Sequence, residues 1–332
     1  MSRATNILLL IAMVTMPLFG HSAKLEKIRV ATSHMPMSQF AGVYVALEKG
    51  FYREMGIDVE LVWPKTTQSA IDMLAKGETD IIANQVLAVL LYNDAHQKAP
   101  IVNLLQTSQH SGLAIVSHEP IYDFEQLKNK KIGVWDKGFH EGGPAFTSTR
   151  YIPGVQWIKT SNNLAPFVSH AVDAQLVTTY NELFMLKMAG FNLHNSQIFA
   201  FRGSNFDIPD DGYYCMKGYG EKHLKQMRDF AEATKKGWRW LHDTRNREEG
   251  VSMTMNLITK FGDRSNRLKQ MNMLNNIIDL QDINSSKLFK LDRNRFNNYT
   301  DLLLRNKVLE HKAYYNEFVL SNMAEAETSQ RK

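Results

Sequence analysis

The chain has 332 residues, of which 44% are hydrophobic and 22% are charged, and its formal net charge is +5. This length exceeds what one small core needs and fits two lobes of ordinary size, and the composition is typical of a globular protein. The basic residues are spread along the chain instead of being clustered among aromatics, so nucleic acid is excluded as an expected partner.

Residues 1–23 differ from the rest of the chain. Arg3 precedes an apolar stretch over residues 7–18, and small residues follow up to Ala23. The stretch is well short of the roughly 20 residues that a membrane-spanning helix needs. The pattern therefore predicts a cleavable signal peptide over residues 1–23 and secretion of the mature chain, with an uncleaved membrane anchor as the alternative.

The chain contains a single cysteine, Cys215, so it can form no internal disulfide. No cysteine lies near residue 20, where lipid attachment after signal cleavage would need one. We therefore expect an unanchored protein located in a Gram-negative periplasm.

From Lys27 onward, short β-branched runs alternate with amphipathic helices. Strands separated by helices of this length predict parallel pairing through right-handed crossovers. The expected strands of this first half are 28–32, 57–63, 79–83, 100–106 and 111–117, and the expected helices are 40–55 and 67–76.

A second α/β unit begins near Phe124. A short helix there leads into a strand that ends at Trp135, and the loop 136–143 opens a helix at Pro144. The unit continues with strands at 155–159, 172–179 and 197–201 and a helix at 180–189.

After Asp207 the chain is almost wholly helical. The expected helices are 222–243, 249–261, 264–277, 294–305 and 311–321. In the first of them Leu224, Met227, Ala231, Trp238 and Leu241 recur at helical spacing, which predicts a face packed on a core.

These elements predict an α/β protein of two lobes, with the C-terminal helices packed back on the first. The chain would cross between the lobes near 111–118 and near 203–213, and ligands of open α/β sheets bind outside the carboxyl ends of the strands. We therefore expect a ligand cleft with a hinge between the lobes. The predicted division is lobe 1 from 24–113 and 208–325, lobe 2 from 114–207, and a disordered tail at 326–332.

Five separated segments resemble one family, the periplasmic binding proteins similar to the thiamine-pyrimidine precursor synthase and its bacterial pyrimidine-binding relatives. The resemblance implies a two-lobed type 2 periplasmic-binding-protein fold with a helical C-terminal extension on lobe 1. It also implies a monomer that delivers a small ligand to a membrane ABC permease. The matching segments are 41–61, 70–81, 123–134, 172–191 and 294–310.

The first loop departs from the family pattern D-W-x-P-N-x-x-H. Over residues 33–40 only Pro36 matches it, and Phe40 stands in place of the histidine. In the synthase branch that histidine is the source of the pyrimidine ring, and a cysteine-rich motif accompanies it. With Phe40 and the single Cys215, the chain is not expected to be an enzyme.

The resemblance places a ligand site after the strand 172–179 in lobe 2. Tyr180 and Glu182 match a tyrosine and a glutamate that face the ligand, and Asn181 lies between them. A tyrosine can stack on a heteroaromatic ring, and a carboxylate accepts hydrogen bonds from ring or exocyclic N–H groups. The alternative for Glu182 is a first-turn acid that interacts with the helix dipole.

The loop after the strand 131–135 supplies further candidates in lobe 2. Gly142 and Gly143 leave backbone N–H groups free at a helix start, which suits an anionic or carbonyl ligand atom, although glycines there are also ordinary turn residues. Trp135 and Glu141 frame the same loop and are predicted to line the pocket.

Lobe 1 is expected to contribute residues from its first loop, a strand end and the second crossing. Asn84 and Gln85 end a strand where the family places a polar contact, and Met37 and Gln39 lie in the first loop. Tyr214 is a candidate clamp over a planar ligand. Each of these side chains has a plain packing role as its alternative.

The predicted function is the capture of a small planar nitrogen-containing solute, similar to a thiamine-precursor pyrimidine, for an ABC importer. One alternative is a ligand-sensing subunit for a membrane signalling protein, and another is a pyrimidine synthase-like enzyme. No cofactor and no metal are expected, because the histidines are scattered without the spacing that zinc sites have.

Overall fold

The computed structural model describes residues 25–65, 68–135, 152, 154–160 and 163–320, and all structural statements below concern these residues. The predicted signal peptide and C-terminal tail lie outside them. No helix of the described chain is both long and apolar enough to span a membrane.

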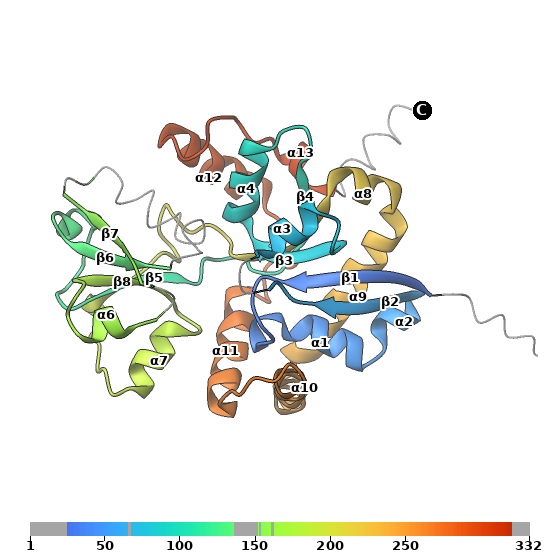
Figure 1. Cartoon of the computed structure of the whole chain (residues 1–332), viewed down its shortest axis with the longest axis horizontal. Helices are drawn as coiled ribbons and strands as arrows, with labels where there is room; N and C mark the ends of the chain where they lie inside the picture. Colours follow the sequence, from blue (N-terminus) through green and yellow to red (C-terminus); the bar gives the residue numbers. More distant parts are fainter. Residues whose placement is uncertain (1–24, 66–67, 136–151, 153, 161–162, 321–332) are drawn as a thin grey trace, which may run out of the picture.

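Two five-stranded sheets form the centres of two lobes, which lie side by side in Figure 1. The sheet of lobe 1 has the order β2-β1-β3-β10-β4, and that of lobe 2 the order β7-β6-β8-β5-β9. In lobe 1 the strands are β1 (Glu26–Thr32), β2 (Ile57–Val62), β3 (Ile81–Gln85), β4 (Ile101–Gln106) and β10 (Asp211–Met216). In lobe 2 they are β5 (Leu113–Ser117), β6 (Lys131–Val134), β7 (Gln156–Lys159), β8 (Ala174–Thr178) and β9 (Ile198–Ala200).

Each sheet combines a parallel part with antiparallel strands. The parallel pairs β1/β2, β1/β3, β6/β7 and β6/β8 are those that strand–helix alternation predicts. Strand β10 runs antiparallel to both β3 and β4, and β5 runs antiparallel to both β8 and β9. Strands β5 and β10 each directly follow a crossing. The chain therefore enters the lobe at the edge nearest the other lobe and runs opposite to the parallel strands.

The position of β5 corrects one prediction. The run 111–117 was expected to close the first half, but Leu113–Ser117 pairs with β8 and β9 and belongs to lobe 2. Strand β10 (Asp211–Met216) is a second difference, because the sequence predicts a crossing there and no strand. Both differences arise because these strands pair with strands that are distant in the sequence.

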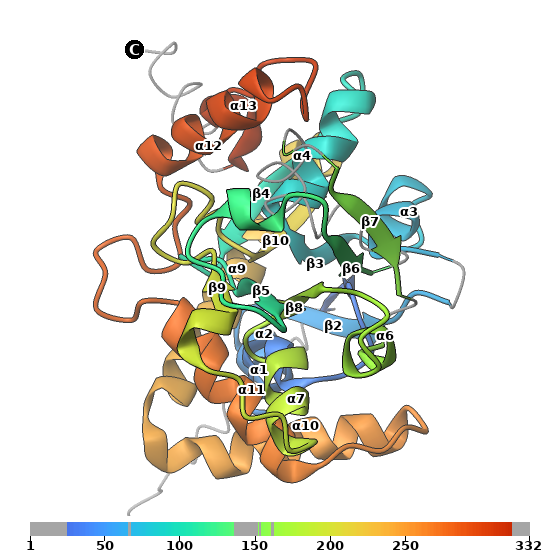
Figure 2. The same cartoon turned by 90° about the vertical axis from the view of Figure 1, so that its left-hand side faces the viewer.

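Helices cover both faces of the lobe 1 sheet, and Figure 2 shows them from the side of lobe 2. The helices of the first half are the 3-10 helix η1 (Ser38–Phe40), α1 (Ala41–Glu48), α2 (Phe51–Glu54), α3 (Ala70–Ala75) and α4 (Val86–Ala95). The predicted helix 40–55 is divided at Gly50, whose positive φ of 75° ends α1. Lobe 2 has η2 (Phe124–Leu127), α6 (Ala165–Val168), α7 (Glu182–Met188) and η3 (Asn195–Gln197).

The C-terminal helices pack on lobe 1, as expected. Helices α1, α2 and α9–α11 share one apolar core with the sheet, and α3, α4, α12 and α13 share a second core on its other face. The predicted stripe on α9 faces the first of these cores, with Met227, Trp238 and Leu241 each at most 1% exposed. The C-terminal elements are α8 (Lys217–Lys222), α9 (Leu224–His242), η4 (Thr244–Asn246), α10 (Arg247–Lys260), α11 (Arg267–Leu280), α12 (Arg293–Arg305) and α13 (Tyr315–Phe318).

Candidate functional site

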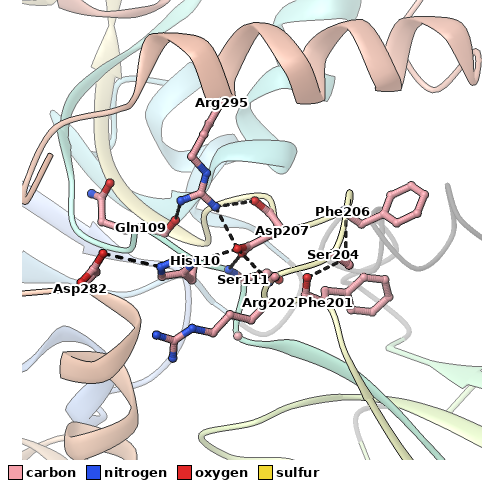
Figure 3. A network of polar contacts seen from close by, with 12 residues as sticks. Gln109, His110, Ser111, Phe201, Arg202, Ser204, Phe206, Asp207, Asp282 and Arg295 are labelled. Carbon is pink, nitrogen blue, oxygen red and sulfur yellow. Dashed lines mark hydrogen bonds and ion pairs between the residues drawn. The ribbon is translucent and has the colours of Figure 1, made fainter. Parts of the chain in front are cut away.

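Two chain segments connect the lobes, one at 107–112 between β4 and β5 and the other at 201–210 between β9 and β10. Figure 3 shows residues of the two crossings together with Arg295 of α12 and Asp282, which follows α11. In Figure 1, β1 and β2 of lobe 1 point toward lobe 2, so their carboxyl ends face this junction. The junction is therefore where the fold places a ligand site.

Asp207 fastens the two crossings to each other. Its carboxylate accepts hydrogen bonds from the backbone N–H of Ser111 at 2.7 Å, from that of Gly203 at 3.1 Å and from His110 Nδ1 at 2.7 Å. Burial alone would raise the pKa of Asp207, but these hydrogen bonds outweigh it and hold the pKa below its usual value. Arg295 of α12 adds an ion pair to the same carboxylate at 3.1 Å.

Asp210 is a buried carboxyl group at the end of the second crossing. It is 3% exposed, and its Oδ2 accepts a hydrogen bond from the backbone N–H of Gly112 at 2.7 Å. Burial raises its pKa well above the usual value, and the adjacent Asp211 raises it further. Asp210 is therefore a neutral group over a wider pH range than an exposed aspartate.

Asp211 begins β10 and connects the crossings to the first loop of lobe 1. Its Oδ2 accepts a hydrogen bond from Gln39 Nε2 at 2.8 Å, and its carbonyl accepts from the backbone N–H groups of Thr107 and Ser108, each at 3.0 Å. Its cross-strand partner is Gln85. The structure thus brings two of the predicted lobe 1 residues to the junction.

The other predicted lobe 1 residues lie close to this point or away from it. Asn84 is 5% exposed, and its Oδ1 accepts a hydrogen bond from the Gln85 backbone N–H at 2.8 Å. Met37 is half-buried against the core of lobe 1. Tyr214 is fully buried, with its ring beside Phe318 in the core of lobe 1, and its hydroxyl donates to Gln106 Oε1 at 3.4 Å. Successive strand residues face opposite sides of a sheet, so a tyrosine on either face of β10 enters a core.

Tyr180 brings lobe 2 into contact with lobe 1. It is 3% exposed and belongs to the lobe 1 core cluster, although it follows β8. A Cβ added at Gly112 would lie 2.7 Å from the Tyr180 ring, 2.8 Å from Asp210 Oδ2 and 2.9 Å from Leu280. The small size of Gly112 is therefore what lets the ring approach Asp210.

Glu182 is the first residue of α7, and both of its carboxylate oxygens have partners within lobe 2. One accepts hydrogen bonds from the Thr178 backbone N–H, at 2.9 Å, and from the Thr178 hydroxyl. The other accepts from Asn181 Nδ2 at 2.8 Å. This arrangement fits the expected alternative, an acid of the first helical turn, and the ligand contact of Glu182 stays a prediction.

The remaining predicted residues belong to the loop after β6. Trp135 is 7% exposed and packs in the core of lobe 2. Glu141, Gly142 and Gly143 lie outside the described residues.

Asp210 and Asp211, which were not among the predicted site residues, also lie at the junction. The signal was the acid pair directly before a β-type run, which is unusual because buried carboxyl groups are rare. The junction residues are those candidates that lie at the two crossings or directly beside them in the chain or the sheet, namely Gln39, Asn84, Gln85, Tyr180, Asn181, Glu182, Asp210 and Asp211.

The junction residues are neutral or acidic, and none of them is basic. Nearby Arg202 and Arg295 form ion pairs with Asp279 and Asp207. Among the described residues, no three histidine, cysteine or acidic side chains are grouped to hold a metal ion. The arrangement offers hydrogen-bond acceptors, amides and one aromatic ring.

Solved structures with the same fold bind solutes or catalyse a reaction. The periplasmic aliphatic sulphonate-binding protein SsuA of Escherichia coli matches with a TM-score of 0.61 at 13% identity, covering 90% of this chain and 98% of that one. The desulfurization enzyme DSZB matches with a TM-score of 0.58 at 13% identity, covering 90% and 99%. These likenesses show that the fold is the periplasmic-binding-protein fold.

A protein of Bacillus subtilis strain 168 that is named as a binding protein, YtlA, is 23% identical over 219 residues. The match covers 61% of this chain and 63% of YtlA, so it spans somewhat less than two thirds of the relative's length. The family model described as NMT1/THI5 like matches residues 37–247, which include η1, both crossings and all the junction residues. The chain belongs to the NMT1/THI5-like family.

Proposed function

We propose that the chain is a periplasmic solute-binding protein that closes its two lobes on a small ligand and delivers it to a membrane ABC permease. The observation that carries this proposal is the junction itself, where both lobes contribute buried polar groups on either side of two crossings. Membership of the NMT1/THI5-like family and the fold shared with E. coli SsuA support it. The same site would serve the alternative of a sensing subunit, which differs only in its membrane partner.

The ligand we propose is a planar, nitrogen-containing molecule similar to a thiamine-precursor pyrimidine. Asp211 and Glu182 supply carboxylate oxygens, which accept hydrogen bonds and favour a ligand with N–H donors. The amides of Gln39, Asn84 and Asn181 can donate or accept. The ring of Tyr180 supports stacking. A sulfonate or nitrate ion is negatively charged, which the carboxylates of Asp211 and Glu182 disfavour and no cation among the junction residues offsets.

The remaining parts of the proposal follow from the sequence. Secretion rests on the predicted signal peptide 1–23, and a monomer is the state that the family resemblance implies. Its lobes divide within the two crossings, 107–112 and 201–210. We propose binding without covalent chemistry, although the fold it shares with DSZB makes an enzyme the second candidate. Incubation with pyridoxal phosphate and iron should release no pyrimidine, and release of one would favour the enzyme.

A binding experiment with an isosteric variant tests the proposed site. Calorimetry should detect binding of an aminopyrimidine and no comparable binding of methanesulfonate or nitrate. Asp211→Asn should weaken the aminopyrimidine affinity by about 1.5 to 3 kcal/mol, because a charged acceptor is replaced by a neutral one. Asp243→Asn, at an aspartate after α9 whose carboxylate contacts Arg245, is the control and should leave the affinity unchanged. Preferential binding of methanesulfonate would contradict the proposed ligand class.

A further inference from the structure

Two serine hydroxyls at the junction are buried without a hydrogen-bond partner in the described part of the chain. Ser38 is 0% exposed and Ser108 is 1% exposed, and neither Oγ atom has a partner there. Most buried side-chain polar atoms in proteins are hydrogen-bonded, so each exception needs a physical reason.

Both serines lie next to the residues that hold Asp211. Ser38 is the first residue of η1 and precedes Gln39, whose amide donates to the Asp211 carboxylate. Ser108 lies in the first crossing, and its backbone N–H donates to the Asp211 carbonyl at 3.0 Å. The two serines therefore lie beside the groups that contact Asp211, one in the first loop and the other in the first crossing.

The backbone of each serine is fixed by other contacts, so the hydroxyls are not needed to hold the chain. The Ser38 N–H donates to Gln270 Oε1 of α11 at 2.7 Å, and the Ser108 carbonyl accepts from Gln106 Nε2 at 3.1 Å. An unsatisfied buried hydroxyl costs about 1 to 3 kcal/mol, a cost that alanine at the same position would avoid. Serine here is therefore unfavourable for the fold alone.

Lobe 2 presents a third unpartnered polar atom at the same junction. Asn181 Nδ2 donates to Glu182, but its Oδ1 is buried and has no partner among the described residues. Asn181 follows Tyr180, whose ring lies against Gly112 and Asp210. Both sides of the junction thus carry polar atoms whose partners are not provided by the described chain.

We propose that the Ser38 and Ser108 hydroxyls bind the solute directly and that Asn181 Oδ1 completes the contact from lobe 2. This inference rests on the proposed solute-binding function. A hydroxyl can donate to a ring nitrogen and an amide oxygen accepts from an amine, so the three atoms suit a heterocycle in which an acceptor nitrogen neighbours an amino group. Binding from both lobes also provides the differential contacts that a closed state requires.

The test separates fold stability from affinity in the full chain. Ser38→Ala and Ser108→Ala should leave the urea midpoint of the free protein unchanged or raised, and each should weaken aminopyrimidine binding about three- to tenfold in calorimetry. Ser117→Ala is the matched control, because that buried hydroxyl donates to the Asp173 carbonyl and accepts from the Glu119 N–H, both at 3.3 Å. It should lower the midpoint and leave the affinity unchanged.

Each outcome decides between the two proposals. If the wild-type chain binds the aminopyrimidine and both serine variants bind it equally well, the inference is overturned and the proposed function stands. A lowered midpoint in Ser38→Ala and Ser108→Ala, with affinity unchanged, would assign the hydroxyls to the fold and also overturn it. A wild-type chain that binds no aminopyrimidine would overturn the proposed ligand and this inference together. Ser108→Cys, which keeps a side chain of similar shape with a weaker donor, should bind with intermediate affinity if Ser108→Ala does not fold.

Discussion

Asp207 and Asp210 show how position changes the behaviour of the same side chain at the residue scale. Asp207 accepts three hydrogen bonds and an ion pair, and its pKa is lowered. Asp210 is more deeply buried, lies beside Asp211, and its pKa is raised. The two aspartates should therefore affect stability with opposite dependence on pH.

Replacing each aspartate by asparagine tests these signs. The stability from Asp207 is present above the unfolded pKa of about 3.9 and is lost as pH falls through its folded value. Asp210 has a raised folded pKa, so its contribution is present below about pH 3.9 and is lost as pH rises toward the folded value. Urea unfolding is measured from pH 3 to pH 8 in steps of about one pH unit. Asp207→Asn should have a lower free energy of unfolding than the wild type mainly at the higher pH values. Asp210→Asn should instead lose less stability than the wild type as pH rises, and equal slopes for the two variants would contradict the assignment.

Glu182 has a structural role whether or not it also contacts the ligand. Glu182→Ala leaves the Thr178 backbone N–H and hydroxyl without their acceptor, and it should lower the free energy of unfolding by about 1 to 3 kcal/mol. Glu182→Gln keeps an oxygen that can accept from Thr178 and should lose less. Urea unfolding measures both variants. An unchanged stability in Glu182→Ala would show that the hydrogen bonds to Thr178 contribute little.

Helices α1 and α9 pack closely in lobe 1, and this packing depends on two glycines. A Cβ at Gly237 would lie 2.0 Å from the Gly42 carbonyl oxygen, and a Cβ at Gly42 would lie 2.4 Å from the Trp238 ring. Trp238 is 1% exposed, so it has little room to move. This contact holds the C-terminal helices against the first unit of the chain.

Alanine at Gly237 should therefore push the two helices apart. We expect Gly237→Ala to lower the free energy of unfolding by about 1 to 3 kcal/mol, because overpacking displaces backbone and side chains. Gly218→Ala is the control, since a Cβ there would meet nothing within 4 Å and the residue lies in α8. The control should be neutral or raise stability by up to about 1 kcal/mol through helix propensity. Equal effects at both sites would contradict the packing argument.

Elements with a clear hydrophobic period could be predicted from the sequence, and those without one could not. The alternation that predicted β1, β2 and β3, and the stripe on α9, are both local patterns. Helix α4 was missed because Val86–Ala95 starts with a continuous apolar run that has no helical period. The last predicted helix, 311–321, contains the four-residue α13 within the described chain. Strand β5 pairs with β8, and β10 pairs with β3, at separations of about 60 residues or more. Local sequence patterns do not reveal such pairings.

At the scale of the whole molecule, lobe 2 contacts lobe 1 along α11 as well as through the crossings. Figures 1 and 2 both show α7 beside α11, and the Lys269 Nζ lies 3.6 Å from the Met185 sulfur. Tyr180 lies near Leu280 at the other end of α11. Any movement of the lobes must therefore rearrange the contact between these two helices.

The positions of some candidate residues follow from the topology, while their contact with a ligand stays a prediction. Gln39, Gln85 and Tyr180 could be predicted because they follow strands or lie in loops at carboxyl ends, which the topology brings together. Trp135 and Tyr214 are buried in the cores of the lobes. The sequence does not separate the two roles, because an aromatic residue in or just after a strand suits packing as well as ligand stacking. The burial of Asp210 arises only where the two crossings meet, so its sequence neighbours do not indicate it.

Ligand-induced closure of the lobes is the central claim, and a distance measurement between spin labels tests it most directly. Lys260→Cys on lobe 1 and Ser169→Cys on lobe 2 place labels at exposed positions, and Cys215 is fully buried and should not react. A saturating aminopyrimidine should shorten the mean distance between the labels and narrow its distribution. Binding of the aminopyrimidine with an unchanged distance distribution would contradict the claim.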